Sequence, residues 1–348
     1  MKRGIRLALI TGAAVVSLAF TSSAWASYSP SLTVTASSNK PGAATSLLLG
    51  HIQSDTDDPT AKDTIYVPLG YGVNLSQPFG TKIGDVSGDL VLRGLGNAHV
   101  ELKASENHMF ADNPASHAAE SLQCTGQPTH EAVWRMDLTI QGQQLHPLIY
   151  VDHVTSAPES TFASAKLQFC LAGPVGTPFG AQLLFAFFDV NGVFTNPSNT
   201  NDHIWNGIFT PYVAGSPTPN PAGTTESQAV IPGRVALTMK TKSLKHGRVI
   251  VSGRLTVDGQ AFPGGLVELY KPGSDKRIGK ARTNRKGNYT IRIKIKKKTR
   301  LLAQVLFLGD LAACPAPPIP LPPPAVTGCS TASVSFFAVK IGTARRKK

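Results

Sequence analysis

Alternating apolar and polar residues predict β-strands along most of this 348-residue chain. The clearest example is Asn288–Lys296, in which three isoleucines alternate with Arg292, Lys294 and Lys296. Alternation with a period of two is typical of a strand that turns one face to a core and the other to water. The water-facing side of this strand is entirely cationic, so the pattern predicts a compact β domain with a basic surface.

Seven segments of this kind follow one another in the C-terminal third of the chain. Turn-forming pairs at Asp258-Gly259, Pro272-Gly273 and Lys286-Gly287 separate several of them. Seven strands is the number found in a simple immunoglobulin-like sandwich. The predicted strands are 235–241, 248–257, 265–270, 277–283, 287–296, 301–308 and 330–341.

The preceding two hundred residues also favour strands, and helices are almost absent from the prediction. The segments are short, evenly spaced and separated by clusters of Gly, Pro and Asn, which is typical of a sandwich. The predicted strands are 31–36, 45–52, 64–67, 89–92, 99–102, 133–140, 148–151, 165–171, 182–190 and 228–231.

The predicted fold class is therefore all-β, with two β-sandwich domains after a secretory signal peptide and an immunoglobulin-like second domain. The first domain is expected to be acidic and to contain a Pro-rich exposed loop or linker at 215–225. The expected parts are a signal peptide at 1–26, the acidic domain at 27–232, the basic domain at 233–342 with a Pro-rich loop at 314–329, and a basic tail at 343–348.

The N-terminal residues have the features of an export signal. A basic start is followed by an apolar run, Leu7–Phe20, and then by Ala24-Trp25-Ala26, an A-x-A cleavage site before Ser27. An uncleaved membrane anchor is the alternative, although the apolar run is short and contains polar residues. No later segment is apolar enough to span a bilayer, so we expect a mature chain without a transmembrane span, secreted or associated with the cell envelope.

The net charge of +13 hides a division between the two predicted domains. Residues 27–233 contain 7 Lys and Arg and 17 Asp and Glu, a net charge of −10. Residues 234–348 contain 24 Lys and Arg and 4 Asp and Glu, a net charge of +20. Such asymmetry indicates a polyanionic partner for the basic half, and colloidal solubility is the alternative explanation.

Four cysteines are expected to form two disulfides in an exported chain. Cys124 is expected to pair with Cys170 in the first domain. A metal site is disfavoured, because the cysteines show no C-x₂-C spacing. Cys314 pairs with Cys329 and closes the Pro-rich loop, which could serve either as a polyproline ligand or as a rigid insertion. Each closure is expected to stabilise the fold by roughly 3 to 4 kcal/mol on the chain-entropy model.

Three segments of the second domain resemble bacterial immunoglobulin-like and carboxypeptidase-regulatory-like modules. They are Val249–Val257 with its Ser-Gly pair, Gly265–Tyr270, and Ala281–Tyr289 with the pattern T-x-x-x-G-x-Y. The resemblance implies the fold and a role as a spacer, adhesin or accessory domain, and it implies no reaction. The first domain resembles uncharacterised secreted bacterial proteins, which implies a surface setting.

The basic domain carries the candidate polyanion-binding residues. Aromatic residues that could stack on bases are not interleaved with them, so no specific nucleic acid is expected, and an anionic cell-wall polymer or glycan is favoured. The alternative is a solvated lysine surface that protects sheet edges. The candidates are Lys240, Lys242, Arg292, Lys294, Lys296, Lys297, Lys298 and Arg300.

The first domain contains one candidate metal site. Asp55, Asp57, Asp58 and Asp63 lie within nine residues, and clustered carboxylates suit Ca²⁺, although their spacing is not that of an EF-hand. A plain solvated loop is the alternative. No motif for a nucleophile, a paired acid and base, or a dinucleotide site is present, and no cofactor is expected.

These observations favour an exported, non-enzymatic binding or structural protein of the cell surface, with a basic domain facing anionic polymers. A secreted hydrolase acting on a glycan or an ester through an unrecognised site in the first domain is the alternative from another class. The third interpretation is that the protein is a structural part of a larger appendage. The oligomeric state is left open.

Overall fold

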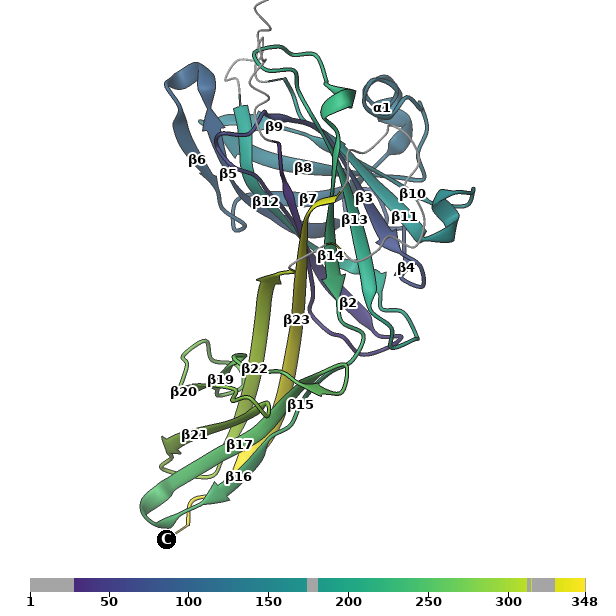
Figure 1. Ribbon diagram of the computed structural model, residues 1–348. Coiled ribbons are helices and arrows are strands. Elements are labelled where there is room, and N and C mark those ends of the chain that lie inside the picture. Colours follow the sequence, from purple (N-terminus) through teal and green to yellow (C-terminus); the bar gives the residue numbers. More distant parts are fainter. Residues whose placement is uncertain (1–27, 174–180, 312–313, 315–328, 348) are drawn as a thin grey trace, which may run out of the picture.

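The described chain forms two lobes built almost entirely of strands (Figure 1). The computed structural model describes residues 28–173, 181–311, 314 and 329–347, so the predicted signal segment and most of the Pro-rich loop lie outside the described residues. One hydrophobic core runs from Leu32 to Ile231 and a second from Leu237 to Ala344. The all-β prediction is confirmed.

The first lobe, residues 28–231, contains fourteen strands, one α-helix and four short 3₁₀ segments among its described residues. They are β1 (Ser31–Ala36), β2 (Ala44–Ile52), β3 (Thr60–Pro68), β4 (Gly72–Val73), β5 (Lys82–Leu92), η1 (Arg93–Leu95), β6 (Ala98–Leu102), β7 (His108–Asp112), η2 (Pro114–His117), α1 (Ala118–Thr125), β8 (Ala132–Ile140), β9 (Gln143–Leu145), β10 (Leu148–His153), η3 (Glu159–Thr161), β11 (Ala163–Cys170), β12 (Ala181–Thr195), β13 (His203–Pro211), η4 (Pro221–Gly223) and β14 (Thr225–Ile231).

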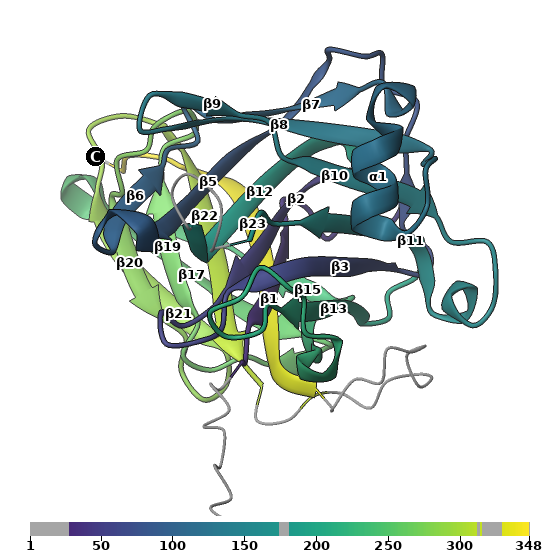
Figure 2. The same cartoon turned by 90° about the horizontal axis from the view of Figure 1, so that it is seen from above.

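One antiparallel ladder connects eleven of these strands in the order β1–β2–β12–β5–β7–β8–β10–β11–β3–β13–β14. The short strands β4, β6 and β9 pair with β12, β5 and β8. The ladder folds over on itself, so that β1 returns to β14, where the Leu32 N–H donates to Ser227 Oγ at 2.8 Å. Trp134, Trp205 and Phe209 are fully buried between the layers. The helix α1 lies outside the layers beside β10 and β11 (Figure 2).

The Pro-rich segment 215–225 connects β13 to β14, which are neighbouring antiparallel strands. A β-bridge between Tyr212 and Pro219 narrows its base. It is therefore the loop of a hairpin within the first lobe, and it does not link the two lobes.

The second lobe, residues 232–347, is a two-layer sandwich. One layer contains β17 with β16 and β21 on its two sides, and the other contains β20, β19, β22 and β23. Val251, Leu269, Ile291 and Phe336 are buried between the layers. The elements are β15 (Val235–Leu237), β16 (Lys240–Ser243), η5 (Lys245–Gly247), β17 (Arg248–Val257), β18 (Gln260–Ala261), β19 (Leu266–Tyr270), β20 (Gly279–Arg282), β21 (Asn288–Lys294), β22 (Thr299–Asp310) and β23 (Cys329–Ala344).

Each of the seven segments predicted for this lobe contains a strand, and the arrangement is compatible with an immunoglobulin-like sandwich. The first segment is split at Thr238, because its carbonyl points at β17. A Cβ at Gly253 would lie 1.8 Å from that carbonyl oxygen, so this position requires glycine. Tyr289 donates its hydroxyl to the same oxygen at 2.8 Å. Gly253 of the Ser-Gly pair and Tyr289 of the T-x-x-x-G-x-Y motif thus both contact the Thr238 carbonyl oxygen.

A single strand, β23, belongs to both lobes. Its first part pairs in parallel with β14, and the remainder pairs with β22 (Figure 1). Hydroxyl groups on alternate residues of β23 also donate to the carbonyls of Pro30, just before β1, and of alternate residues of β1. In the described structure, β1 has no main-chain partner strand on that side. The hydrogen bonds run from Thr331 to Pro30 at 3.0 Å, from Ser333 to Leu32 at 2.7 Å, and from Ser335 to Val34.

Candidate functional site

The outer face of the layer formed by β16, β17 and β21 carries the predicted cationic residues. Lys242 on β16 and Arg292 on β21 lie opposite the same β17 residue, Ile250. Arg248 of β17 lies opposite Lys294. Residues in such rows have Cβ atoms about 5 Å apart, so their side chains form one continuous surface.

The eight predicted residues are all exposed, but they are not all on this face. Lys240, Lys242, Arg292 and Lys294 share it, and the three lysines at 296–298 lie in the connection from β21 to β22. Arg300 lies on β22, in the opposite layer. We define the cationic face as Lys240, Lys242, Arg248, Arg254, Arg292 and Lys294.

Two members of the cationic face, Arg248 and Arg254, were missed by the sequence reasoning. Both are exposed, and both alternate with the buried residues of β17. The alternation in 248–257 could have identified them, because Arg248, Ile250, Ser252 and Arg254 have the same parity and hence the same face.

No acidic residue occurs in β15, β16, β17, β18 or β21. Among the described residues of the second lobe, Arg277 and Glu268 form the one ion pair. Glu268 lies on β19, in the layer opposite the cationic face. The cationic face is therefore not neutralised by the chain itself. Like charges across adjacent strands destabilise a sheet slightly, and an anion bound over them removes that cost.

The four aspartates of the predicted metal site do not gather around one point in the described part of the chain. Asp57 is buried and its carboxylate accepts the N–H groups of Ser29 at 3.4 Å and Ser54 at 3.3 Å. Asp63 is buried elsewhere, 2.9 Å from His51 Nδ1. Within the described ranges, no three His, Cys, Asp or Glu side chains gather as metal ligands. Asp55 and Asp58 thus belong to a loop that Asp57 closes by hydrogen bonding.

Both predicted disulfides are present. Cys124–Cys170 ties the last turn of α1 to the end of β11, and Cys314–Cys329 joins the segment after β22 to the start of β23. The Pro-rich loop that the second disulfide closes lies outside the described residues. None of the described helices has the length and hydropathy of a membrane-spanning segment.

Histidine–carboxylate pairs are the main feature of the first lobe that sequence reasoning missed. Seven of the nine histidines lie within ion-pair distance of a carboxylate. The partners are far apart in the chain, so no spacing pattern could have shown them. The pairs are His51–Asp63, His99–Asp89, His108–Asp85, His117–Asp112, His130–Asp152, His146–Asp137 and His153–Glu131.

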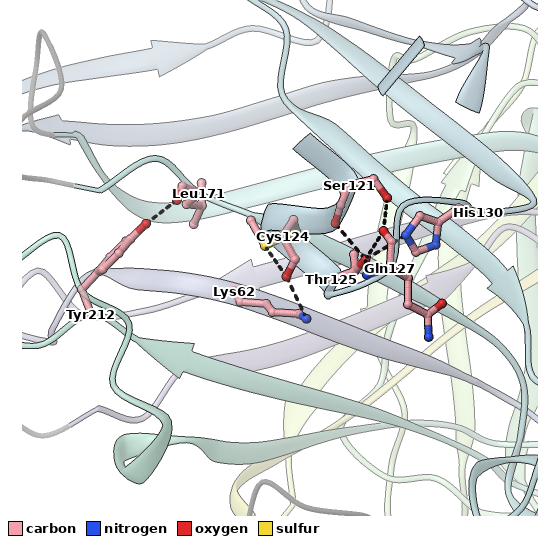
Figure 3. Close-up of a disulfide and its surroundings, with 9 residues drawn as sticks. Lys62, Ser121, Cys124, Thr125, Gln127, His130, Leu171 and Tyr212 are labelled. Atoms are coloured by element: carbon pink, nitrogen blue, oxygen red, sulfur yellow. Dashed lines mark hydrogen bonds between the residues drawn. A yellow bond between two sulfur atoms is a disulfide. The ribbon is translucent and has the colours of Figure 1, made fainter. Parts of the chain in front are cut away.

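One of these pairs continues into a hydroxyl group. His130 Nδ1 lies 2.6 Å from Asp152 Oδ2, and His130 Nε2 lies 2.9 Å from Thr125 Oγ1 at the end of α1 (Figure 3). The order carboxylate, imidazole, hydroxyl is that of a catalytic triad. Thr125 Oγ1 also accepts the Gln127 N–H at 3.1 Å and donates to the Ser121 carbonyl at 2.9 Å, so the same hydroxyl closes the helix terminus.

A cleft of about 880 Å³ opens beside the Cys124–Cys170 disulfide. Lys62 reaches it from β3 and donates to the Cys124 carbonyl at 3.1 Å (Figure 3). Burial, together with the nearby charge of Lys166, lowers the pKa of Lys62. Burial and the charge of Glu120 raise the pKa of Tyr150, on another wall, to about 12.

Comparison with known proteins identifies no family. No protein-family model matches this chain, and no curated protein matches it. Among solved structures, one match is described as the D0-D1 domain of Intimin; it is 9% identical, covers 88% of this chain and 99% of that chain, and has a TM-score of 0.18. At that TM-score the likeness carries no argument, so the proposals below rest on this chain's own residues.

Proposed function

We propose that this protein is an exported, non-enzymatic binding protein whose second lobe holds an anionic polymer of the cell envelope. The observation that supports this is the cationic face, six Lys and Arg side chains on three adjacent strands that contain no acid. The predicted signal peptide and the two disulfides support export, because disulfides persist in oxidising surroundings.

The face suits a polymer better than a small anion. It is an exposed surface whose side chains stand in register on adjacent, hydrogen-bonded strands. Each contact on such a surface is weak and screened by salt, so affinity comes from several contacts made at once. A repeating polyanion provides them.

The test is binding of purified protein to immobilised poly(glycerol phosphate) at about 50 mM and about 500 mM salt. The charge-reversal variant is Arg292→Glu with Lys294→Glu. The matched control is Lys271→Glu with Lys276→Glu, two exposed lysines around the turn between β19 and β20. Both variants change the net charge equally, so they separate the cationic face from bulk charge.

We expect the face variant to lose at least about tenfold in affinity, the control to lose much less, and high salt to release the native protein. Equal losses in the two variants would show that net charge alone drives binding. Binding that persists at high salt would also contradict the proposal.

Hydrolysis is a second candidate function, favoured by the Asp152–His130–Thr125 alignment. It ranks below binding because the threonine hydroxyl already closes the end of α1. Turnover of a glycan or ester that Thr125→Val abolishes, without loss of folding, would favour it.

A further inference from the structure

The cleft beside the first disulfide is separate from the cationic face and lies in the other lobe. Several parts of the first lobe line it, among them α1, the turn before β10 together with its first residue Leu148, the end of β11, and the β13–β14 loop. Its volume of about 880 Å³ is in the range of small-molecule sites, which are about 300 to 1,000 Å³. The disulfide fixes α1 to β11, so the opening between these walls is held in place.

Lys62 supplies an unneutralised positive charge to this cleft. Lys62 is a half-buried residue, and its ammonium group donates one hydrogen bond, to the Cys124 carbonyl at 3.1 Å. It forms no ion pair with any carboxylate of the described residues, and the nearby charge that affects it is another cation, Lys166. A partly desolvated ammonium with free N–H donors is stabilised by an anion, and charge-assisted hydrogen bonds are the strong ones.

The other walls are largely apolar, with a few polar groups at the rim. Pro217, Pro219 and Pro221 stand exposed along one side. Tyr212 is anchored below them by its hydroxyl, which donates to the Leu171 carbonyl at 2.6 Å (Figure 3). Flat apolar walls accommodate the C–H face of a sugar ring, because the ring buries apolar area there without losing its hydroxyl contacts.

The rim provides partners for hydroxyl groups. Glu120 and Gln123 are exposed on α1 at the cleft, and together they offer carboxylate and amide acceptors and amide donors. Thr210 adds a hydroxyl on the β13 side. A single fixed cation, an apolar wall and a mixed polar rim differ from the uniform charge of the second lobe, so the two sites recognise different features.

We propose that this cleft binds a sugar that carries a carboxylate, with the carboxylate at Lys62 Nζ and the ring against the proline wall. Glu120 and Gln123 then contact ring hydroxyls. The inference does not rest on the proposed function, because every residue involved lies in the first lobe. With both sites, the chain would bind a polyanion on its second lobe and one acidic sugar unit in the cleft of its first lobe.

The test is calorimetric titration of the purified protein with N-acetylmuramic acid and with N-acetylglucosamine, which lacks the carboxylate-bearing ether. We expect the acidic sugar to bind at least about tenfold more tightly, because the neutral one leaves Lys62 without its ion pair. Equal affinities, or no binding of the acidic sugar, would overturn the proposal. Glycylglycine provides a third arm, and binding as tight as that of the acidic sugar would show that the cleft takes a peptide carboxylate instead.

Variants localise the binding. Lys62→Met keeps an unbranched side chain without the charge and should remove the preference for the acidic sugar. Lys103→Gln, a change of an exposed lysine in the same lobe, should change nothing. Gln123→Trp fills the cleft from an exposed helix position, so it tests the site even if Lys62→Met fails to fold. Arg292→Glu with Lys294→Glu should bind the sugar as the native protein does. Unchanged binding in both cleft variants would place the sugar elsewhere.

Discussion

The two lobes use their charged residues in opposite ways. In the first lobe, nine of the seventeen carboxylates lie in ion pairs, seven of them with histidine. In the second lobe, residues 234–348 contain 24 Lys and Arg, of which Arg277 is the one in an ion pair among the described residues. Many charged side chains of the first lobe therefore pair with one another within the lobe, whereas those of the second lobe remain accessible to solvent or to a partner.

Burial follows the same division. The side chains of His51 and Asp63 are only 1% and 4% exposed, inside the first lobe. Burial lowers the pKa of His51, but Asp63 and Gln53 outweigh this effect and leave the pKa raised. In the second lobe, Arg277 and Glu268 are 46% and 21% exposed. A buried pair whose partner is removed is costly, whereas an exposed pair contributes little.

The largest effect should come from breaking the buried pair. Asp63→Ala leaves a buried imidazole without its carboxylate and should destabilise the first lobe by about 3 kcal/mol. Tryptophan fluorescence during chemical unfolding measures this lobe selectively, because Trp134 and Trp205 are both in it and Trp25 belongs to the predicted signal segment.

The matching change in the second lobe is Glu268→Ala, which removes the carboxylate of its exposed pair. We expect the free energy of unfolding to fall by less than about 1 kcal/mol. Chemical unfolding monitored by far-ultraviolet circular dichroism measures this change. Equal losses of stability in Asp63→Ala and Glu268→Ala would contradict the conclusion that charged residues stabilise the first lobe and not the second.

The second lobe was the more predictable of the two, for a physical reason. Its strands β17, β19 and β21 place their buried residues at alternate positions, and its turns use residues that accept positive φ, such as Asp258 at 50° and Gly259 at 78°. Local sequence therefore carried most of the information about strand positions and about the exposure of Lys242 and Arg292.

The first lobe shows where local patterns fail. Strand β5 begins at Lys82, but only 89–92 was predicted, because Gly84 and Gly88 suggest turns. These glycines are in fact required within the strand, since a Cβ at Gly84 would lie 2.3 Å from the Asp189 carbonyl oxygen. The cleft could not be predicted at all, because its walls come from segments far apart in the chain.

A smaller effect is expected at the junction of the lobes, where hydroxyl groups of β23 replace main-chain donors for β1. Ser333→Ala with Ser335→Ala removes the donors to the Leu32 and Val34 carbonyls, both of which are buried. Each lost hydrogen bond costs about 1 kcal/mol, so we expect about 2 kcal/mol by tryptophan fluorescence.

Thr343→Ala is the control for the junction, since it makes the same kind of change at an exposed position of β23. It should be nearly neutral. If the double variant were equally neutral, these hydroxyl bonds would contribute nothing to the stability of the first lobe, and the main-chain pairing of β23 with β14 would be left as the connection between the lobes.

The smallest effect concerns an exposed histidine pair, and it depends on pH. The pKa of His153 is raised, because its ring donates to Glu131 at 2.6 Å and to the Val73 carbonyl at 3.0 Å. A raised folded pKa gives stability that is complete below the unfolded value of about 6.5 and is lost as the pH rises through the folded value.

Glu131→Gln should therefore lower the pKa of His153 and reduce the free energy of unfolding by about 0.5 kcal/mol near pH 5.5, but not near pH 9. Proton NMR of the ring and unfolding at the two pH values measure both quantities, with Glu101→Gln, an exposed acid of the same lobe, as the control. A cost that is the same at both pH values would mean that Glu131 acts by packing, and that at least this pair of the first lobe does not stabilise it by charge.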